Sequence, residues 1–288
     1  MPKRPLTAVE SFDLRQALQV ATLDALMASR RWEPGDLIFQ GGTSLHLAYG
    51  SPRFSEDLDF LVSDALKLDS IAESVQTRLE GASWFPADTR LTVTKARESG
   101  NLHAFDVTLG GQDVLGAVRV KVEMWRADKA AMAEVAVLVR PVRLNRGPTS
   151  GMQTFVPTAE LQEILADKVF ALGARPYLKP RDVFDLYWLQ RQNDLRSCSE
   201  QDMKVRLAFY RGEDAFGWIE KAQQRVNELS EPTETVVNDL RRWLPSSWPL
   251  TAASAEAMKR AAVDLLERGI ERMREVEATR DAAAALTP

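Results

Sequence analysis

The chain has 288 residues, 45% hydrophobic and 27% charged, which is typical of globular proteins with one large or two modest domains. Its formal net charge is −4, so the overall field excludes nonspecific coating of nucleic acid, and any such contact needs a local basic patch. A single cysteine, Cys198, excludes an internal disulfide, and two histidines are too few for a usual zinc site. The lack of disulfides favours a reducing, cytoplasmic setting, and no apolar run approaches membrane-spanning length, so we expect no membrane contact.

The first predicted elements surround a pair of glycines. Thr7 and Glu10 have capping-box spacing and precede apolar residues at helical intervals, which predicts a long first helix. The run "LIFQ" is typical of a short buried strand and leads directly into Gly41-Gly42, and the alternating run "DLDFLV" predicts a second strand. We expect a helix, a strand, a short helix and a strand over residues 8–30, 37–40, 43–49 and 57–62.

The remaining chain changes character near residue 155. A helix over 69–81 is followed by three strand-like runs, at 89–97, 101–109 and 116–125, and the exposed stretch 140–151 then reads as a basic loop containing Arg140, Arg143 and Arg146. Strand signals fade after this loop, and Thr158 is a suitable N-cap for the next helix. We expect helices over 159–175, 180–192, 200–228, 232–243 and 252–285. The sequence therefore predicts a mixed α/β domain over 1–155 and an all-helical domain over 156–288.

Two aspartates share one side of the second predicted strand. Asp57 and Asp59 are two residues apart and therefore point the same way, while Leu58 and Phe60 point into the core. Carboxylates this close repel each other unless a cation lies between them, and carboxylate oxygens with substrate phosphates are the ligands that Mg²⁺ prefers. The alternative is an ordinary solvent-facing strand on which the aspartates are merely tolerated.

Two polar loops flank this strand. Gly41-Gly42 stands between a strand and a helix, where backbone N–H groups can approach a phosphate, and Thr43 and Ser44 add hydroxyl groups. A tight turn alone would also favour glycine. It would not account for the second loop, "GSPRFSED", in which Arg53 can meet phosphate oxygens and Ser55 lies two residues before the acids.

A site with two metal ions generally needs a third carboxylate. Glu123 in "VKVEMW" and Asp106 in "AFDVT" both lie between apolar residues on predicted strands. Spacing does not choose between these two residues, and either fits an exposed position on a half-buried strand.

Charged residues also interrupt the first two helices of the predicted helical domain. Lys168 lies within the apolar stripe of helix 159–175, which indicates a paired lysine or one that reaches a cavity; the alternative is snorkelling at the edge of the interface. Arg181 and Asp185 have the i, i+4 spacing of a surface ion pair, while Asp182 stands at the start of an otherwise apolar and aromatic helix.

Taken together, the segment with Gly-Gly-Thr-Ser, a short helix and Arg-x-Ser-x-Asp-x-Asp resembles the nucleotidyltransferases of the polymerase beta type. More narrowly, "GGTSLHLAYGSPRFSEDLDF" resembles the AbiEii family, toxins of type IV toxin–antitoxin and phage abortive-infection systems. Three further family motifs are matched in order by "KVE", "LADKVFALGAR" and "KPRDVFDL", so the resemblance covers about residues 36–190. The matched positions in these motifs are Lys121, Glu123, Lys168, Arg181, Asp182 and Asp185.

The resemblance implies the nucleotidyltransferase fold and transfer of a nucleoside monophosphate from an NTP to an acceptor hydroxyl, with release of pyrophosphate. It implies Mg²⁺ bound by Asp57 and Asp59, and it favours Glu123 over Asp106 as the third ligand. It implies that the catalytic residues are Asp57, Asp59, Lys168 and Asp182, the last two contributed to the cleft by the helical domain. The residues implied in NTP binding are Gly41, Gly42, Thr43, Arg53, Ser55, Lys168, Arg181 and Asp185.

The resemblance further implies that the acceptor is the 3′ end of tRNA, that translation is blocked, and that a separately encoded antitoxin opposes the toxin. Two other hypotheses remain open. One keeps the chemistry but changes the acceptor to a small molecule or a protein hydroxyl. The other is a non-catalytic nucleotide-binding module that kept the fold.

Overall fold

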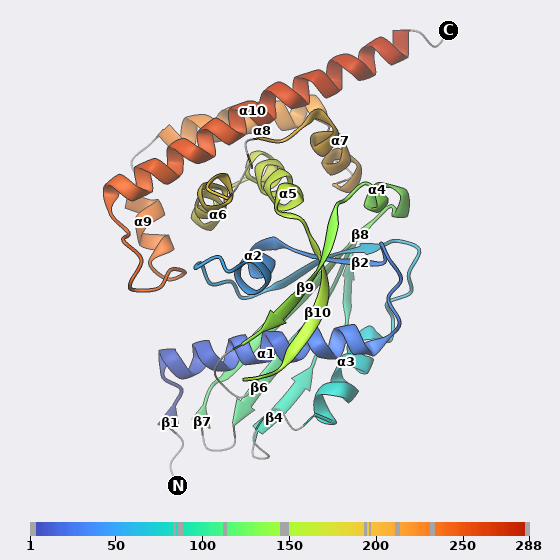
Figure 1. The fold of residues 1–288 in the computed structure, drawn as a ribbon, viewed down its shortest axis with the longest axis vertical. Helices are drawn as coiled ribbons and strands as arrows, with labels where there is room; N and C mark the ends of the chain where they lie inside the picture. The colour runs from blue at the N-terminus through green and yellow to red at the C-terminus, as the bar shows by residue number, and fades with distance from the viewer. Residues whose placement is uncertain are drawn as a thin grey trace. The chain divides into compact units, whose positions relative to one another are not determined.

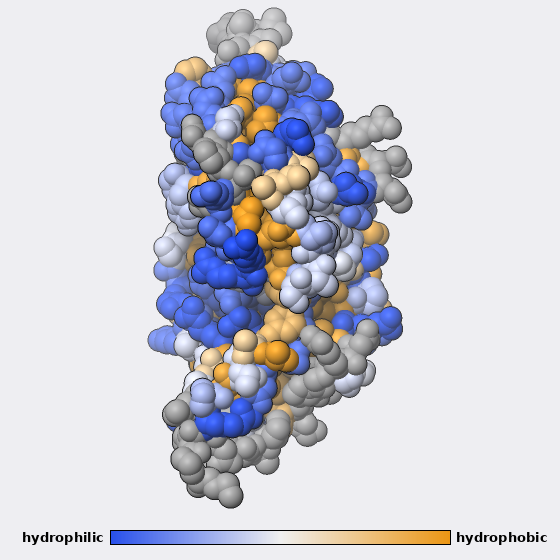
Figure 2. All heavy atoms as spheres, turned by 90° about the vertical axis from the view of Figure 1, so that its left-hand side faces the viewer, coloured by the Kyte–Doolittle hydropathy of each residue, from blue (hydrophilic) through white to orange (hydrophobic). Residues whose placement is uncertain are grey.

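The computed structural model describes residues 4–82, 85, 89–111, 114–144, 150–192, 195, 197–210, 214–230 and 234–285 (Figure 1). The chain folds into two compact units. Unit 1 comprises residues 1–50, 55–133 and 137–159, and unit 2 comprises residues 51–54, 134–136 and 160–288. Within the described part of the chain, no helix is both long and apolar enough to span a membrane. Hydrophilic side chains cover most of the face shown in Figure 2, with smaller hydrophobic patches between them.

Unit 1 is a mixed sheet with helices. Its helices are α1 (Ala8–Ser29), α2 (Gly41–Tyr49), α3 (Ile71–Glu80) and α4 (Lys129–Ala133). The main sheet has the strand order β4 (Thr89–Val93), β6 (Leu102–Gly111), β8 (Ala117–Ala127), β3 (Leu58–Ser63), β2 (Leu37–Gln40), β10 (Gln153–Ala159) and β9 (Val137–Arg143), with β5 (Arg97–Ser99) paired to β6. Two short strands, β1 (Arg4–Pro5) and β7 (Val114–Leu115), pair separately.

One face of this sheet is covered by helices, and α1 crosses it as Figure 1 shows. The capping box at Thr7 and Glu10 is present and starts α1, as its sequence predicts. Alternate strand residues such as Phe39, Phe60 and Val120 are buried against α1 and α3 in a single core. Strand alternation therefore leaves Asp59 and other polar residues on the opposite face, away from that core, whereas Asp57, predicted as a strand residue, directly precedes β3.

Unit 2 is helical. Its helices are α5 (Leu161–Ala174), α6 (Pro180–Gln190), α7 (Glu200–Phe209), α8 (Ala215–Ser230), α9 (Glu234–Leu240) and α10 (Ala252–Ala285). The indole of Trp218 is fully buried, stacks on Phe170 and donates its N–H to the Phe170 carbonyl at 2.9 Å. Gly173 is required beside it, because an added Cβ would lie 2.6 Å from the indole ring.

The structure corrects the expectation that strand signals end near residue 151. Residues 137–143 and 153–159 form the antiparallel pair β9–β10, and β10 also pairs with β2. Thr158 is accordingly a strand residue with an extended backbone, and Glu160 takes the N-cap position of α5. Arg140 and Arg143 belong to β9 rather than to a loop, and Arg146 lies outside the described residues.

Candidate active site

The register of three strands brings Asp59 and Glu123 together on the face opposite the core. Asp59 on β3 is the cross-strand partner of Glu123 on β8, and Glu123 is in turn the partner of Ala104 on β6. Paired positions on neighbouring strands are about 4.8 Å apart and their side chains point the same way. The strand register therefore brings together the positions of Asp59 and Glu123, and Asp57 lies directly before β3 begins, in the adjoining segment.

Asp106 occupies a different position on the same face. It is the cross-strand partner of Lys121, so β8 separates it from the strand that carries Asp59. Two strand spacings amount to about 10 Å. The Asp106 side chain is buried and accepts a hydrogen bond from Arg97 at 2.9 Å. Of the two candidates for the third acid, Glu123 is therefore the one adjacent to Asp59.

Lys121 supplies a positive charge among these acids. Its ammonium group forms an ion pair with Glu123 on the same strand. The pKa of Lys121 is raised, chiefly by this hydrogen bond to Glu123 and further by the negative charges of Glu123, Asp57 and Asp106. The ammonium group thus offsets the mutual repulsion that carboxylates on one sheet face would otherwise experience.

Gly41 makes the closest approach of the glycine turn to the acids. Its φ of +81° lies in the left-handed region, and a Cβ at this position would lie 2.5 Å from Oδ2 of Asp59. Both the backbone angle and the lack of space therefore require glycine. Gly41 is also the first residue of α2, which has no side-chain cap, so this helix begins with backbone N–H groups beside the Asp59 carboxylate.

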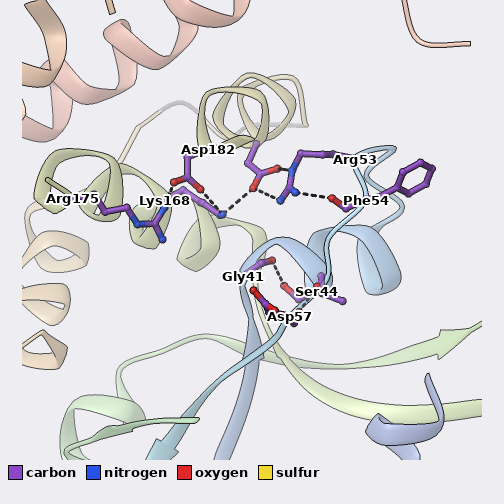
Figure 3. Close-up of polar contacts among 10 residues, drawn as sticks. Gly41, Ser44, Arg53, Phe54, Asp57, Lys168, Arg175 and Asp182 are labelled. Carbon is purple, nitrogen blue, oxygen red and sulfur yellow. Dashed lines mark hydrogen bonds and ion pairs between the residues drawn. The ribbon is translucent and has the colours of Figure 1, made fainter. Parts of the chain in front are cut away.

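The hydroxyl groups of this turn have partners within the protein. Thr43 is fully buried and donates to the backbone carbonyl of Asp57, while Ser44 donates to the Gly41 carbonyl at 2.8 Å (Figure 3). Because a hydroxyl group has one hydrogen to donate, the Thr43 hydroxyl in this conformation positions Asp57 instead of binding phosphate. The backbone N–H of Thr43 belongs to the start of α2.

A buried glutamine, which sequence reasoning did not single out, fixes the loop before the acids. Gln19 on α1 is fully buried, and its side-chain amide donates to the carbonyls of Ser55 and Glu56 at 2.9 and 3.0 Å. The signal in the sequence was a glutamine within the most apolar stretch of the first helix. Ser55 itself is half-buried, two residues from Asp57.

Unit 2 contains a second group of charged residues, built around Lys168. Its ammonium group lies 2.9 Å from Oδ1 of Asp182 and 2.8 Å from Oδ2 of Asp185. Arg53 donates from Nε and Nη2 to the two oxygens of Asp185 at 2.5 and 2.7 Å, and Arg175 pairs with the other oxygen of Asp182 (Figure 3). We call these five side chains the buried ion cluster; three cations and two carboxylates give it one net positive charge.

Four side chains of the cluster are almost closed to solvent and Arg175 is partly exposed, and the charges stabilise one another. Burial alone would raise the pKa of Asp182 and Asp185, but the positive charges of Lys168 and Arg53, joined at Asp182 by Arg175, outweigh burial and lower both pKa values. Burial would likewise lower the pKa of Lys168, yet the two carboxylates raise it. All members are therefore ionised at neutral pH, as buried charges require partners.

These contacts decide two of the alternatives left by the sequence. Lys168 is only 8% exposed and paired, so snorkelling at an interface edge is wrong. Asp185 is fully buried with Arg53 and Lys168, so a surface ion pair with Arg181 is also wrong. The guanidinium of Arg181 instead lies 5.0 Å from the ring centre of Trp243. Because Arg53 donates to Asp185 and to the Phe54 carbonyl, its geometry is that of a structural anchor rather than a phosphate ligand.

The donor set on the sheet suits a hard divalent cation. Asp57, Asp59 and Glu123 offer carboxylate oxygens, which is the chemistry that Mg²⁺ prefers. Among the described residues, however, no three His, Cys, Asp or Glu side chains are gathered closely enough to hold a metal ion. The ion pair between Lys121 and Glu123 accounts for one of these carboxylates, so metal binding requires that pair to open.

Comparison with known families decides which family the chain belongs to. The family described as "Nucleotidyl transferase AbiEii toxin, Type IV TA system" matches residues 24–278, most of the chain. The chain belongs to the AbiEii family. This match confirms the predicted resemblance. The chain is a nucleotidyltransferase toxin of the type IV toxin–antitoxin class. No curated protein sequence matches the chain.

Solved structures share the fold of this AbiEii member. MenT4, a nucleotidyltransferase toxin from Mycobacterium tuberculosis, matches with a TM-score of 0.57 and 19% identity, covering 96% of this chain and 94% of that one. JHP933 from Helicobacter pylori matches with a TM-score of 0.50 and 16% identity over 98% of this chain and 100% of that chain. The predicted fold class, a nucleotidyltransferase-type mixed sheet followed by helices, is confirmed.

Proposed function

We propose that this AbiEii protein transfers a nucleoside monophosphate from an NTP to an RNA hydroxyl in a Mg²⁺-dependent reaction. The observation that carries the proposal is the register of Asp59 with Glu123, beside the glycine that starts α2. Carboxylates in this arrangement provide the oxygen ligands for a divalent ion, and the helix N-terminus provides N–H groups for phosphate.

In the proposed reaction, the acceptor hydroxyl oxygen attacks the α-phosphorus of the NTP. The bond from that phosphorus to the bridging oxygen breaks, and pyrophosphate leaves with the electron pair. Asp57, Asp59 and Glu123 would hold Mg²⁺, which when bound supplies Lewis-acid stabilisation of the phosphate charge. Glu123 would accept the proton of the attacking hydroxyl, and the N–H groups of Gly42 and Thr43 would bind phosphate oxygens together with Ser55.

The buried ion cluster has a supporting part in the proposal. Lys168 would neutralise charge that develops on the triphosphate, and Asp182 would hold Lys168 in place, as their 2.9 Å contact allows. Arg53 is a member of the cluster and precedes Asp57 by only four residues in the sequence. We propose that the helical domain, predicted over 156–288 and helical from α5 onward, contributes Lys168 and Asp182 to the site, and that Arg181 and Asp185 act at the nucleotide or through the cluster.

We propose the 3′ end of tRNA as the acceptor, with blocked translation as the consequence. The family to which the chain belongs implies an antitoxin partner, and we propose a cytoplasmic location, where tRNA is available. This part of the proposal rests on the family assignment and on the presence of every motif residue that the resemblance requires.

Incubation of the full chain with each α-labelled NTP, with and without total RNA, tests the proposal. We expect label in a tRNA-sized band from the wild type and none from Asp57→Asn, which keeps the side-chain shape but removes the charge. Label that appears without RNA would identify the acceptor as a small molecule or a protein instead of RNA. Identical behaviour of the wild type and Asp57→Asn would contradict the enzymatic function and leave a non-catalytic module.

A further inference from the structure

The sheet face that carries the acids continues along β8 as a basic surface. Strand alternation places Lys121 and Arg119 on the same face as Glu123, about 7 and 13 Å away from it along the strand. The Arg119 side chain is 67% exposed, and the Lys121 side chain is 33% exposed. Positive charge therefore begins directly beside the third acid and extends away from it.

The neighbouring strands widen this surface with hydroxyl groups and a second arginine. Thr108 on β6 is the cross-strand partner of Arg119 and of Thr92 on β4, and Arg90 lies two residues from Thr92 on the same face. Arg90 and Thr92 are exposed and Thr108 is half-buried, whereas Leu91 on the other face packs against the core. We call Arg90, Thr92, Thr108, Arg119 and Lys121 the basic strip.

The nearest carboxylate leaves the Arg119 guanidinium able to bind an anion. Asp106 is buried and accepts a hydrogen bond from Arg97, and its other oxygen lies 3.9 Å from Nε of Arg119, beyond hydrogen-bond distance. An ion pair of this length at an exposed arginine contributes little. A phosphate oxygen can therefore compete for the Arg119 guanidinium.

The chemistry of the basic strip fits a phosphodiester backbone better than a protein surface. Arginine, lysine and threonine are common donors to nucleic-acid phosphates, and they position a strand without reading its bases. The exposed large hydrophobic side chains among the described residues lie on α1, β9, β10, α8 and the segment before α6, and not on β4, β6 or β8. A chain of net charge −4 needs such a local patch to bind RNA at all.

We propose that the basic strip binds the phosphodiester backbone of the acceptor RNA and directs its 3′ end to Asp57, Asp59 and Glu123. The inference rests on the proposed function, because it takes RNA as the acceptor. The strip has Lys121 at the end beside Glu123 and Arg90 at the far end, so a strand lying along it would end at the acids. Binding through the strip is independent of RNA sequence and falls as salt concentration rises.

Fluorescence anisotropy with labelled total tRNA, over a series of salt concentrations and without NTP, tests the strip directly. We expect Arg119→Ala and Arg90→Ala each to weaken binding about threefold and to reduce the slope of log affinity against log salt by about one. Arg78→Ala is the matched control: Arg78 is also exposed, but it lies on α3, which packs on the other sheet face. The control is expected to bind as the wild type does.

Transfer kinetics separate RNA docking from chemistry. With full-length tRNA, both strip variants should raise KM and keep kcat; with a trinucleotide acceptor, too short to reach Arg90, Arg90→Ala should have wild-type rates. If both variants bind tRNA with wild-type affinity and salt slope while the wild type labels RNA, the strip proposal is overturned and the proposed function stands. If the wild type labels no RNA, the proposed function fails, and the strip proposal falls with it.

Discussion

At the scale of single residues, Gly41 shows how closely the turn and the acids depend on each other. Because Gly41 has no Cβ, Oδ2 of Asp59 can lie where a Cβ would otherwise clash with it. The positive φ of Gly41 also excludes most other residues. The fold tolerates this approach only with glycine, so the turn and the Asp59 carboxylate form one structural unit. The same turn carries Thr43, whose hydroxyl fixes the backbone at Asp57.

The variant Gly41→Ala tests this dependence. An alanine at φ +81° costs about 1–2 kcal/mol of stability and displaces the Asp59 carboxylate. We expect a modestly lower free energy of unfolding together with loss of at least about 100-fold in kcat, measured by denaturation and by NTP transfer. Gly35→Ala is the control, because Gly35 has a similar φ but nothing near an added Cβ. Equal kcat values for the two variants would contradict the account.

At the scale of elements, the buried ion cluster holds the first two helices of unit 2 to the segment 51–54. Arg53 from that segment, Lys168 from α5 and Asp185 from α6 satisfy one another's charges with almost no exposure to water. Removing one partner of such a group leaves a buried charge uncompensated, which costs about 3–5 kcal/mol. Cluster members are thus expected to matter for folding as well as for any catalytic role.

Asp185→Asn tests the cluster through its pH dependence. At pH 7 we expect urea denaturation to give a free energy of unfolding about 3–5 kcal/mol below that of the wild type. The lowered pKa of Asp185 means that its contribution is present above its unfolded pKa of about 3.8 and is lost as pH falls. The difference between variant and wild type should therefore shrink below pH 3.8.

The raised pKa of Lys168 sets the other limit of this pH window. Its contribution is complete below the unfolded pKa of 10.5 and is lost as pH rises through the higher folded value. Stability from the cluster should accordingly be constant between about pH 4 and pH 10.5. Glu275→Gln is the control, because the pair of Glu275 with Arg272 is exposed and should change stability by less than about 1 kcal/mol. If the difference in unfolding free energy between Asp185→Asn and the wild type were the same at every pH, the assignment of this stability to charged Asp185 would be contradicted.

Elements could be predicted from the sequence wherever the signal is local. The capping box and apolar periodicity predicted α1, alternation predicted β3, and the strand-like runs 101–109 and 116–125 predicted β6 and β8. The strands β9 and β10 were not predicted, because Pro141 and Pro157 weaken the strand signal in the sequence. The structure places Pro141 on the edge strand, where one side of the backbone needs no partner.

Long-range pairing is the part that the sequence could not supply. Arg53 and Asp185 are 132 residues apart, and the local spacing of Asp185 pointed to Arg181 instead. Arg175 was not singled out at all, because nothing in its neighbourhood indicates that Asp182 needs a second cation. Likewise, the choice between Asp106 and Glu123 depends on strand register, which only the sheet reveals.

At the scale of the whole molecule, the family assignment and one arrangement of acids together define the proposed enzyme. The chain is an AbiEii nucleotidyltransferase toxin by its match over residues 24–278, and its fold is shared with MenT4. The central claim is that Asp57, Asp59 and Glu123, and not Asp106, form the metal-binding acids of this molecule. This claim predicts opposite results for two isosteric variants, Glu123→Gln and Asp106→Asn.

The most direct measurement is Mg²⁺-dependent pyrophosphate release from NTP and tRNA, with Mn²⁺ binding followed in parallel. We expect Glu123→Gln to lose at least about 100-fold in rate and to bind Mn²⁺ more weakly, because it removes a charged oxygen ligand beside Asp59. Asp106→Asn should keep both properties within a few fold, and addition of EDTA to the wild type should abolish release. Loss of rate and of Mn²⁺ binding in Asp106→Asn, with both retained in Glu123→Gln, would contradict the account.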